Sequence, residues 1–265
     1  MDLGLRNMVV LITGGSKGIG RACAFEFARE GAVLALCARQ EDGLKRTADE
    51  IRAETGRPVF TVAGDMMKWE DAKRCVDAAA AHYGGLDVLV NCAGASPGGL
   101  LLNLTEEEWQ LSLQLKFMGY VRGAKAAIPH LLQRGAGRII NVVGNDGIKP
   151  AYWELTASAA NAADLAMTAA LAEQYGSQGI LVNAINPGPV ATERWSGLVR
   201  AYARDKGMSF DDASRQAVKS LPLGRICTPE EVASVVVFVS SARASYMNGA
   251  WITLDGGQRK AIMDV

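Results

Sequence analysis

The stretch VVLITGGSKGIG, residues 9–20, decides the fold of this chain. Its first five residues are apolar or β-branched and predict a buried strand, and residues 19–30 continue with a helical apolar pattern. Glycines at a strand-to-helix turn let backbone N–H groups approach a phosphate, and the N-terminus of the helix adds a favourable dipole. The sequence therefore predicts a pyrophosphate-binding loop that consists of Gly14, Ser16, Lys17, Gly18, Ile19 and Gly20.

The alternation of strand and helix continues along the chain. Further short apolar runs lie at residues 33–37, 59–62, 88–90, 139–143, 181–185 and 251–254. Amphipathic stretches lie between them, at residues 41–55, 68–83, 105–133, 156–176 and 229–240. Strands that are apolar on both faces are typical of a parallel sheet covered by helices on each side. We predict an α/β fold, a single doubly wound parallel sheet of Rossmann type with about seven strands, in one domain over residues 1–265.

Residues 193–221 interrupt this pattern with a longer polar and aromatic segment that contains Trp195, Tyr202 and Phe210. Long insertions in α/β enzymes are often lids over the substrate. We predict a substrate lid here, and a packed pair of surface helices is the alternative.

Composition excludes several classes of protein. The 28 Lys and Arg residues balance the 28 Asp and Glu residues, so the chain has no bulk field to attract nucleic acid or an anionic membrane. No signal-peptide pattern and no run of ~18 apolar residues is present, so we predict a cytoplasmic protein. The 5 cysteines form no CxxC pair and there are only 2 histidines, so we predict no metal site.

Several separated motifs resemble those of the short-chain dehydrogenase/reductase family. They are the glycine loop at residues 13–20, Asn91-Cys92-Ala93-Gly94, Pro187-Gly188-x-Val190-x-Thr192, Leu223-Gly224-Arg225 and Asp255-Gly256-Gly257. The resemblance covers nearly all of the chain and is to the branch of 3-oxoacyl-carrier-protein reductases. It implies a nicotinamide dinucleotide cofactor, an oxidoreductase activity, and a homodimer or homotetramer. It also implies cofactor contacts at Asp65, Met66, Asn91, Ala93, Gly94, Pro187, Gly188, Val190 and Thr192.

Charges near the second strand favour NADP(H) over NAD(H). A carboxylate at the tip of this strand would bind the ribose hydroxyls of NAD and repel a 2′-phosphate. Here the position is Ala38, followed by Arg39, and Lys17 lies in the glycine loop. Two cations without a carboxylate favour the dianionic 2′-phosphate.

The resemblance fails at the positions that carry proton transfer in the family. The family uses a tyrosine, a lysine one helical turn later, a serine on the preceding strand and an asparagine from another helix. In this chain the matching positions are Ala157, Asn161, Gly144 and Lys116. All four residues have changed, so the usual proton-transfer group is absent.

Two of these changes suggest a transposed pair. Lysine has replaced asparagine at position 116, and asparagine has replaced lysine at position 161, at positions that face each other in the family. A buried lysine can have a lowered pKa and act as acid or base. We predict catalytic roles for Lys116 and Asn161 and, from the loop at residues 144–155, for Tyr152. Three further residues of this loop are alternatives to Tyr152: Asn145, Asp146 and Glu154.

The sequence predicts an NADP(H)-dependent oxidoreductase that acts on a small carbonyl or alcohol substrate through a non-standard proton-transfer site. Trp195, Tyr202 and Met208 suggest a substrate of apolar or aromatic character. Two alternatives stay open because a fold does not determine its chemistry. One is an NADP(H)-binding pseudoenzyme, and the other is a non-redox lyase or isomerase on the same scaffold.

Overall fold

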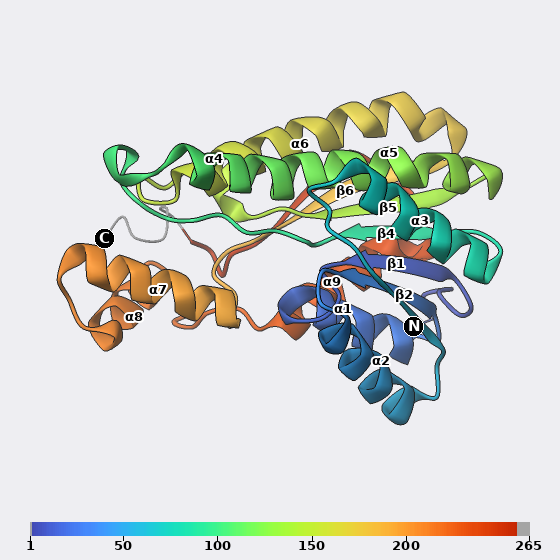
Figure 1. The fold of residues 1–265 in the computed structure, drawn as a ribbon, viewed down its shortest axis with the longest axis horizontal. Coiled ribbons are helices and arrows are strands. Elements are labelled where there is room, and N and C mark those ends of the chain that lie inside the picture. The colour runs from blue at the N-terminus through green and yellow to red at the C-terminus, as the bar shows by residue number, and fades with distance from the viewer. Residues whose placement is uncertain (1, 259–265) are drawn as a thin grey trace.

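The first strand, β1 (Val9–Thr13), is completely buried inside a seven-stranded parallel sheet in the computed structural model, which describes residues 2–258 (Figure 1). The order of the strands is β3-β2-β1-β4-β5-β6-β7. The other strands are β2 (Val33–Ala38), β3 (Val59–Ala63), β4 (Val88–Asn91), β5 (Gly137–Val142), β6 (Ile180–Pro187) and β7 (Trp251–Leu254). The predicted doubly wound parallel sheet is confirmed.

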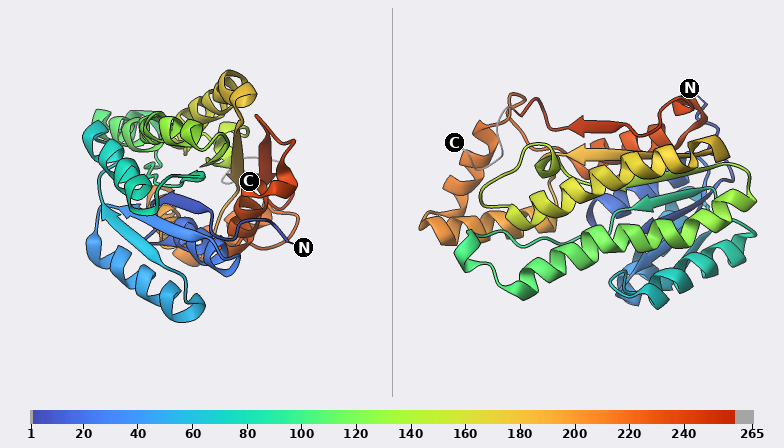
Figure 2. Two further views of the ribbon diagram at one scale, coloured as in Figure 1. Left: turned by 90° about the vertical axis from the view of Figure 1, so that its right-hand side faces the viewer. Right: turned by 90° about the horizontal axis from the view of Figure 1, so that it is seen from above.

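Helices cover both faces of the sheet (Figures 1 and 2). One face carries α1 (Gly18–Arg29), α2 (Glu41–Thr55) and α9 (Pro229–Ser240). The other carries α3 (Trp69–Tyr83), α4 (Glu106–Ser112), α5 (Met118–Gln133) and α6 (Leu155–Tyr175). Each face encloses its own cluster of buried apolar side chains, as expected for strands that are apolar on both sides.

The sheet reverses its strand order between β1 and β4, which are neighbours although β2 and β3 lie between them in sequence. In open α/β sheets, ligands bind at the carboxyl ends of the strands beside such a switch point. The loops after β1 and β4 are the glycine loop and the Ala93-Gly94 turn. The fold therefore brings two of the predicted cofactor motifs together.

The predicted helix at residues 105–133 is not regular. A five-residue π-helical turn, Leu113–Phe117, joins α4 to α5. A π-helical turn inserts an extra residue and rotates the side chains that follow, and such turns are frequent at functional sites. This turn contains Lys116, which is buried.

Residues 193–221 form a pair of helices, α7 (Glu193–Lys206) and α8 (Phe210–Lys219), that extends beyond the carboxyl ends of the strands (Figure 1). A small apolar cluster holds them against Trp153, whose indole Nε1 donates a hydrogen bond of 3.0 Å to Asp205. The segment is thus a packed helix pair, and its role as a lid remains a prediction.

Within residues 2–258, no helix is long and apolar enough to cross a membrane. The same part of the chain contains no group of three or more His, Cys, Asp or Glu side chains that could hold a metal ion.

Candidate active site

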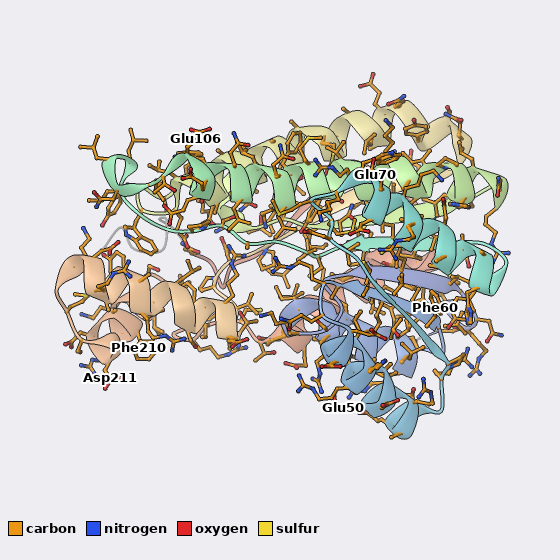
Figure 3. All side chains as sticks on the ribbon, in the orientation of Figure 1. Glu50, Phe60, Glu70, Glu106, Phe210 and Asp211 are labelled. Atoms are coloured by element: carbon orange, nitrogen blue, oxygen red, sulfur yellow. The ribbon has the colours of Figure 1, made fainter. Side chains whose placement is uncertain are left out.

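A cavity of about 740 Å³ lies at the carboxyl ends of the strands. Its walls come from the glycine loop, from the segments after β4, β5 and β6, and from α7, whose side chains lie across from those of the α4 region (Figure 3). Most of the predicted cofactor residues line it. They are Gly14, Ser16, Lys17, Gly18, Ile19, Gly20, Arg39, Met66, Ala93, Gly94, Pro187, Gly188, Val190 and Thr192.

The glycine loop leaves no room for side chains at its tightest points. A Cβ atom on Gly20 would lie 2.3 Å from the carbonyl oxygen of Gly14, and one on Gly14 would lie 3.0 Å from the Cα atom of Ala93. Gly14 also has a φ of +73°, and Gly18 has a φ of +55°, in the region that favours glycine. The loop thus exposes its backbone to the cavity at the start of α1, which is the geometry that a pyrophosphate needs.

Two cationic side chains line the cavity, Arg39 directly after β2 and Lys17 in the glycine loop. Among residues 2–258 the guanidinium of Arg39 has neither a hydrogen bond nor an ion pair, and the side chain is exposed at the cavity. Lys17 Nζ lies 3.5 Å from Glu193 Oε2, but both side chains are about 80% exposed, so this contact is weak. The two cations therefore fit a phosphate group on the adenosine ribose.

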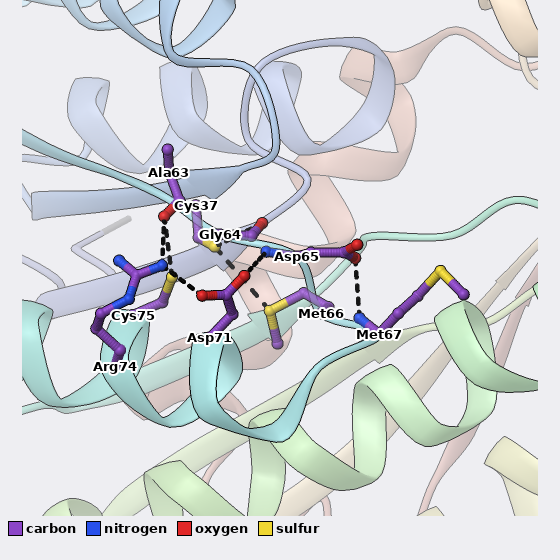
Figure 4. A network of polar contacts seen from close by, with 9 residues as sticks. All are labelled: Cys37, Ala63, Gly64, Asp65, Met66, Met67, Asp71, Arg74 and Cys75. Carbon is purple, nitrogen blue, oxygen red and sulfur yellow. Dashed lines mark hydrogen bonds and ion pairs between the residues drawn. The ribbon is translucent and has the colours of Figure 1, made fainter.

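Asp65 is not part of the cavity wall, in contrast to the cofactor contact that the resemblance implies. Its carboxylate Oδ1 accepts a hydrogen bond of 3.0 Å from the backbone N–H of Met67, and its own N–H donates to Asp71 Oδ2 at 3.0 Å (Figure 4). The side chain stabilises the turn between β3 and α3. Met66, which follows it, does line the cavity.

Asn91 is likewise absent from the cavity wall. It is fully buried, and its Nδ2 donates a hydrogen bond of 2.9 Å to Asn141 Oδ1 on the neighbouring strand. Asn141 Nδ2 in turn donates to Thr168 Oγ1 of α6 at 2.9 Å. Asn91 therefore connects β4, β5 and α6 instead of facing the cofactor site.

Lys116 lies in the wall of the cavity with only 4% of its surface exposed. Its Nζ donates a hydrogen bond of 2.5 Å to the carbonyl oxygen of Val143. Burial lowers the pKa of Lys116 to about 8; the positive charge of Arg194 also lowers it, and the negative charge of Asp164 opposes the shift. The side chain of Lys116 can therefore convert between the ammonium and the neutral amine near neutral pH.

Asn161 lies in the same cavity wall, against the loop that follows β5. A Cβ atom on Gly144, the position of the family's serine, would lie 2.6 Å from Asn161 Nδ2. The Oδ1 atom of Asn161 is buried without a hydrogen-bond partner in the described part of the chain. The structure thus brings Lys116 and Asn161 to one cavity, which fits the hypothesis of a transposed pair.

Asp164, one helical turn after Asn161, was not anticipated from the sequence. It is fully buried, and neither carboxyl oxygen has a hydrogen-bond partner within residues 2–258. Burial raises the pKa of Asp164 to about 8, and the positive charge of Lys116 opposes the shift. The sequence does contain a sign of this site, because Asp164 is the one charged residue in the mainly apolar stretch 159–167.

Glu154, which is buried, and Asp146, which is half-buried, bring two carboxyl groups into the cavity wall. Asp146 lies in a short turn after β5, Glu154 directly precedes α6, and each carboxyl group influences the pKa of the other. Burial and the nearby Asp146 raise the pKa of Glu154 well above its usual value. Both shifts favour the protonated form of the carboxyl group. The sequence offered both residues only as alternatives to Tyr152.

Tyr152 itself does not reach the cavity. Its side chain is 41% exposed, and Lys206 Nζ lies 5.1 Å from the centre of its ring. The loop directs this side chain outward, so we remove Tyr152 from the candidate site. Asn145 also stays outside the cavity, because its Nδ2 donates hydrogen bonds to Asp255 Oδ2 at 3.1 Å and to Gln258 Oε1 at 3.3 Å.

The end of the cavity beneath α7 is mainly apolar. Trp195 lines it, as predicted, together with Leu111 and Leu198. Tyr202 does not: it is 2% exposed and packs edge-on against Trp153, with ring centres 5.4 Å apart. Met208 is also absent from the cavity wall.

Comparisons with known proteins agree with this geometry. A family model described as enoyl-(acyl carrier protein) reductase matches residues 14–259. The short-chain reductase protein NovJ of Streptomyces niveus is 35% identical over 255 residues, which cover 94% of this chain and 93% of that protein. The 3-oxoacyl-[acyl-carrier-protein] reductase FabG of Chlamydia muridarum is 31% identical over 253 residues, which cover 96% of this chain and 98% of the relative.

Solved structures are similar over nearly the whole chain. L-sorbose reductase from Gluconobacter frateurii, complexed with NADPH and L-sorbose, has a TM-score of 0.91 at 34% identity and covers 97% of this chain and 98% of its own. A single-residue variant of actinorhodin polyketide ketoreductase, solved with NADPH, has a TM-score of 0.91 at 30% identity, covering 95% of this chain and 97% of its own.

Proposed function

The chain belongs to the short-chain dehydrogenase/reductase family of NAD(P)-dependent oxidoreductases, and we propose that it is an NADP(H)-dependent member with a non-standard proton-transfer site. A carbonyl compound or the corresponding alcohol is the proposed substrate. One observation carries the proposal. A single cavity connects the glycine loop and Arg39 at one end with the buried, ionisable Lys116 at the other.

The preference for NADP(H) rests on charge. Arg39 has no partner among the described residues, and Lys17 makes only an exposed contact with Glu193. A 2′-phosphate would satisfy both cations, since guanidinium and ammonium groups bind phosphate strongly. The similar L-sorbose reductase was solved with NADPH, which supports the same choice here.

Lys116 is the proposed participant in proton transfer. When bound, NADPH supplies a hydride to a carbonyl carbon. The ammonium of Lys116, held by the carbonyl oxygen of Val143, places a buried positive charge in the same cavity and stabilises negative charge that develops on the substrate oxygen. Asn161 supplies a neutral amide whose buried Oδ1 is free to accept a hydrogen bond among the residues described.

The proposed substrate is a small molecule with an apolar or aromatic part. Trp195, Leu198 and Leu111 form the apolar wall that would contact it, and the pair α7–α8 would cover it as a lid. A homodimer or homotetramer is proposed because α9 and the edge strand β7 expose apolar side chains, including Trp251 at 49% and Phe238 at 39%. The cytoplasm remains the predicted compartment.

The first test is the fluorescence of NADPH during titration with the protein, with NADH in parallel. We expect binding of NADPH in preference to NADH. Turnover is then followed at the NADPH absorbance band with L-sorbose, acetoacetyl-CoA and 4-formylbenzenesulfonate, which are suggested by the names of relatives, and with a wider panel of ketones and alcohols. Absence of binding up to millimolar NADPH would contradict the proposal.

The second test concerns Lys116. Replacement by methionine keeps the length of the side chain and removes its charge, so we expect Lys116→Met to abolish turnover and to leave the affinity for NADPH nearly unchanged. Lys219→Met, at an exposed position of α8 outside the cavity, is the matched control and should retain full activity. Undiminished turnover by Lys116→Met would remove the lysine from the mechanism.

Two other functions remain as outcomes of these tests. The loss of the hydroxyl groups at Gly144 and Ala157 favours a pseudoenzyme, which would bind NADPH but turn over no compound of the panel. A lyase or isomerase on the same scaffold would convert its substrate without any change in NADPH absorbance.

A further inference from the structure

The carboxyl pair formed by Asp146 and Glu154 has no role in the function proposed above. Both side chains line the cavity, each carboxyl group influences the pKa of the other, and Glu154 is only 6% exposed. Neither carboxyl group accepts a hydrogen bond from a side-chain N–H or a hydroxyl group within residues 2–258. The pair is therefore available to a molecule bound in the cavity.

Both residues are fixed by their backbone. Asp146 lies in the turn Asn145–Gly147 at the end of β5, and the backbone N–H of Glu154 donates a hydrogen bond of 3.1 Å to Ala151. Glu154 also pairs with Gly99 in an isolated β-bridge, and the N–H of Gly99 donates to the carbonyl oxygen of Trp153 at 2.7 Å. The loop is thus tied to the segment after β4, which holds the carboxyl of Glu154 at the cavity.

The charges around the pair come from different elements. Lys116 lies on the π-helical turn before α5, Arg194 on α7, and Asp164 on α6; Glu108 of α4 also lines the cavity. The positive charges of Arg194 and Lys116 act on Asp146, and that of Arg194 acts on Glu154. These cations would offset the second negative charge that the pair acquires when it releases its proton.

We propose that Glu154, which lines the cavity together with Asp146, is the acid that protonates the oxygen of the substrate. The proposal rests on the oxidoreductase function given above. Reduction of a carbonyl adds a hydride to carbon, supplied by NADPH, and a proton to oxygen. The O–H bond of Glu154 breaks, a new O–H bond forms on the substrate, and its electron pair stays on the carboxylate. In alcohol oxidation the same carboxylate accepts the proton.

This assignment gives different roles to the carboxyl pair and to Lys116. Glu154 and Asp146 hold and deliver the proton, and Lys116 stabilises the negative charges on the substrate and on the pair. A buried carboxyl pair without function would only destabilise the protein, because two acidic groups lose their hydration for one shared proton. Perturbed acidic groups in a cavity are typical of sites that transfer protons.

The kinetic experiment uses the full chain with NADPH and a reducible compound from the panel above. Glu154→Gln keeps the volume of the side chain and removes the proton, so kcat for reduction should fall ~10²–10⁴-fold while the affinity for NADPH stays within about twofold. Glu70→Gln, an exposed change on α3, is the matched control and should leave kcat unchanged. An unchanged kcat in Glu154→Gln would overturn the proposal.

The pH profile of Asp146→Asn distinguishes proton transfer from a purely structural role, because a structural change would not shift the pH dependence of kcat/KM. Asp146 raises the pKa of Glu154, so without it Glu154 loses its proton at a lower pH. We expect the alkaline limb of the pH profile of kcat/KM for reduction to shift to lower pH in Asp146→Asn. A limb that stays in place would contradict the assignment of the proton to this pair.

A measurement without substrate separates the two proposals. Carboxyl signals of isotope-labelled protein, followed by infrared spectroscopy, should show a protonated carboxyl at neutral pH, besides that of Asp164, that disappears in Glu154→Gln. If every carboxyl other than that of Asp164 titrates below about pH 5, within the usual range of Asp and Glu, the shared proton does not exist and the assignment is wrong. If the shared proton is seen but the wild type has no NADPH-linked turnover, the oxidoreductase function fails, and the role of Glu154 as its acid fails with it.

Discussion

The Nζ atom of Lys116 lies 2.5 Å from the carbonyl oxygen of Val143, the residue that directly precedes Gly144. This hydrogen bond connects the π-helical turn before α5 to the end of β5. It holds a buried ammonium group beside Gly144 in the cavity wall. In the function proposed here, this charge takes part in proton transfer.

The first prediction concerns Asp164, which faces the charge of Lys116. Asp164→Asn removes the carboxylate that raises the pKa of Lys116, so this pKa should fall below about 8. If the ammonium form is needed for reduction, the alkaline limb of kcat should move to lower pH. The measurement is a pH profile of kcat with Asp42→Asn, an exposed change on α2, as the control. A limb that stays in place would mean that Asp164 does not act on Lys116.

The second prediction concerns the stability of the same variant, Asp164→Asn, as a function of pH. Burial raises the pKa of Asp164 from 3.8 to about 8, so the folded state binds more protons than the unfolded state between these values. The contribution of the protonated Asp164 carboxyl to the stability of the fold is complete below pH 3.8 and is lost as the pH rises through about 8. The melting temperature of Asp164→Asn should thus rise relative to wild type between pH 5 and pH 8. A difference that stays constant over this range would show that Asp164 is ionised in the folded protein.

The third prediction tests cofactor selectivity. Arg39→Ala removes a cation without a partner in the described structure, and hydrogen bonds to charged groups contribute about 1.5–3 kcal/mol. The affinity for NADPH should fall ~10- to 150-fold, and the affinity for NADH should change little. Arg46→Ala, at an exposed position of α2 outside the cavity, should bind NADPH like the wild type. Equal losses for both cofactors would refute the assignment of Arg39 to the 2′-phosphate.

The fourth prediction concerns the glycine loop. Gly20→Ala places a Cβ atom 2.3 Å from the carbonyl oxygen of Gly14, which is backbone and cannot move without opening the loop. We expect destabilisation by ~1–3 kcal/mol and loss of NADPH binding. Gly119→Ala is the control, because its Cβ atom would meet only ordinary contacts of 3.5 Å or more. Calorimetry and NADPH fluorescence give both quantities, and tight binding by Gly20→Ala would contradict the described loop.

The fifth prediction concerns the missing serine. Gly144→Ser should destabilise the protein, because its Cβ atom would lie 2.6 Å from Asn161 Nδ2 and its φ is +149°. Combination with Asn161→Ala removes the collision but leaves the backbone strain. The double variant should therefore be more stable than the sum of the two single changes predicts. Additive melting temperatures would show that Gly144 and Asn161 do not compete for the same space.

Local sequence predicted most of the fold because its signals are short in range. The apolar runs at 9–13 and 251–254 have the bounds of the observed strands, and the helices at 41–55 and 229–240 agree in the same way. The glycine loop and its binding of a pyrophosphate could be predicted because only glycine fits at Gly14 and Gly20, so the residue type alone indicates the close approach of the backbone.

The proton-transfer site could be predicted only in part. Lys116 and Asn161 were found from their positions in the motifs, and both line the cavity. The sequence could not decide between Tyr152 and Glu154 as a residue of the site, because the direction of a side chain in a loop depends on contacts that are distant in sequence.

The sequence by itself determined the parallel sheet and the glycine loop, because these depend on residue type and spacing. Only the tertiary structure decided which ionisable side chains share the cavity and how their surroundings shift their pKa values. Burial and the approach of α5, α6 and α7 set the pKa values of Lys116, Asp164 and Glu154. The free energy of a buried charge depends on its neighbours in space, and no local pattern in the chain encodes them.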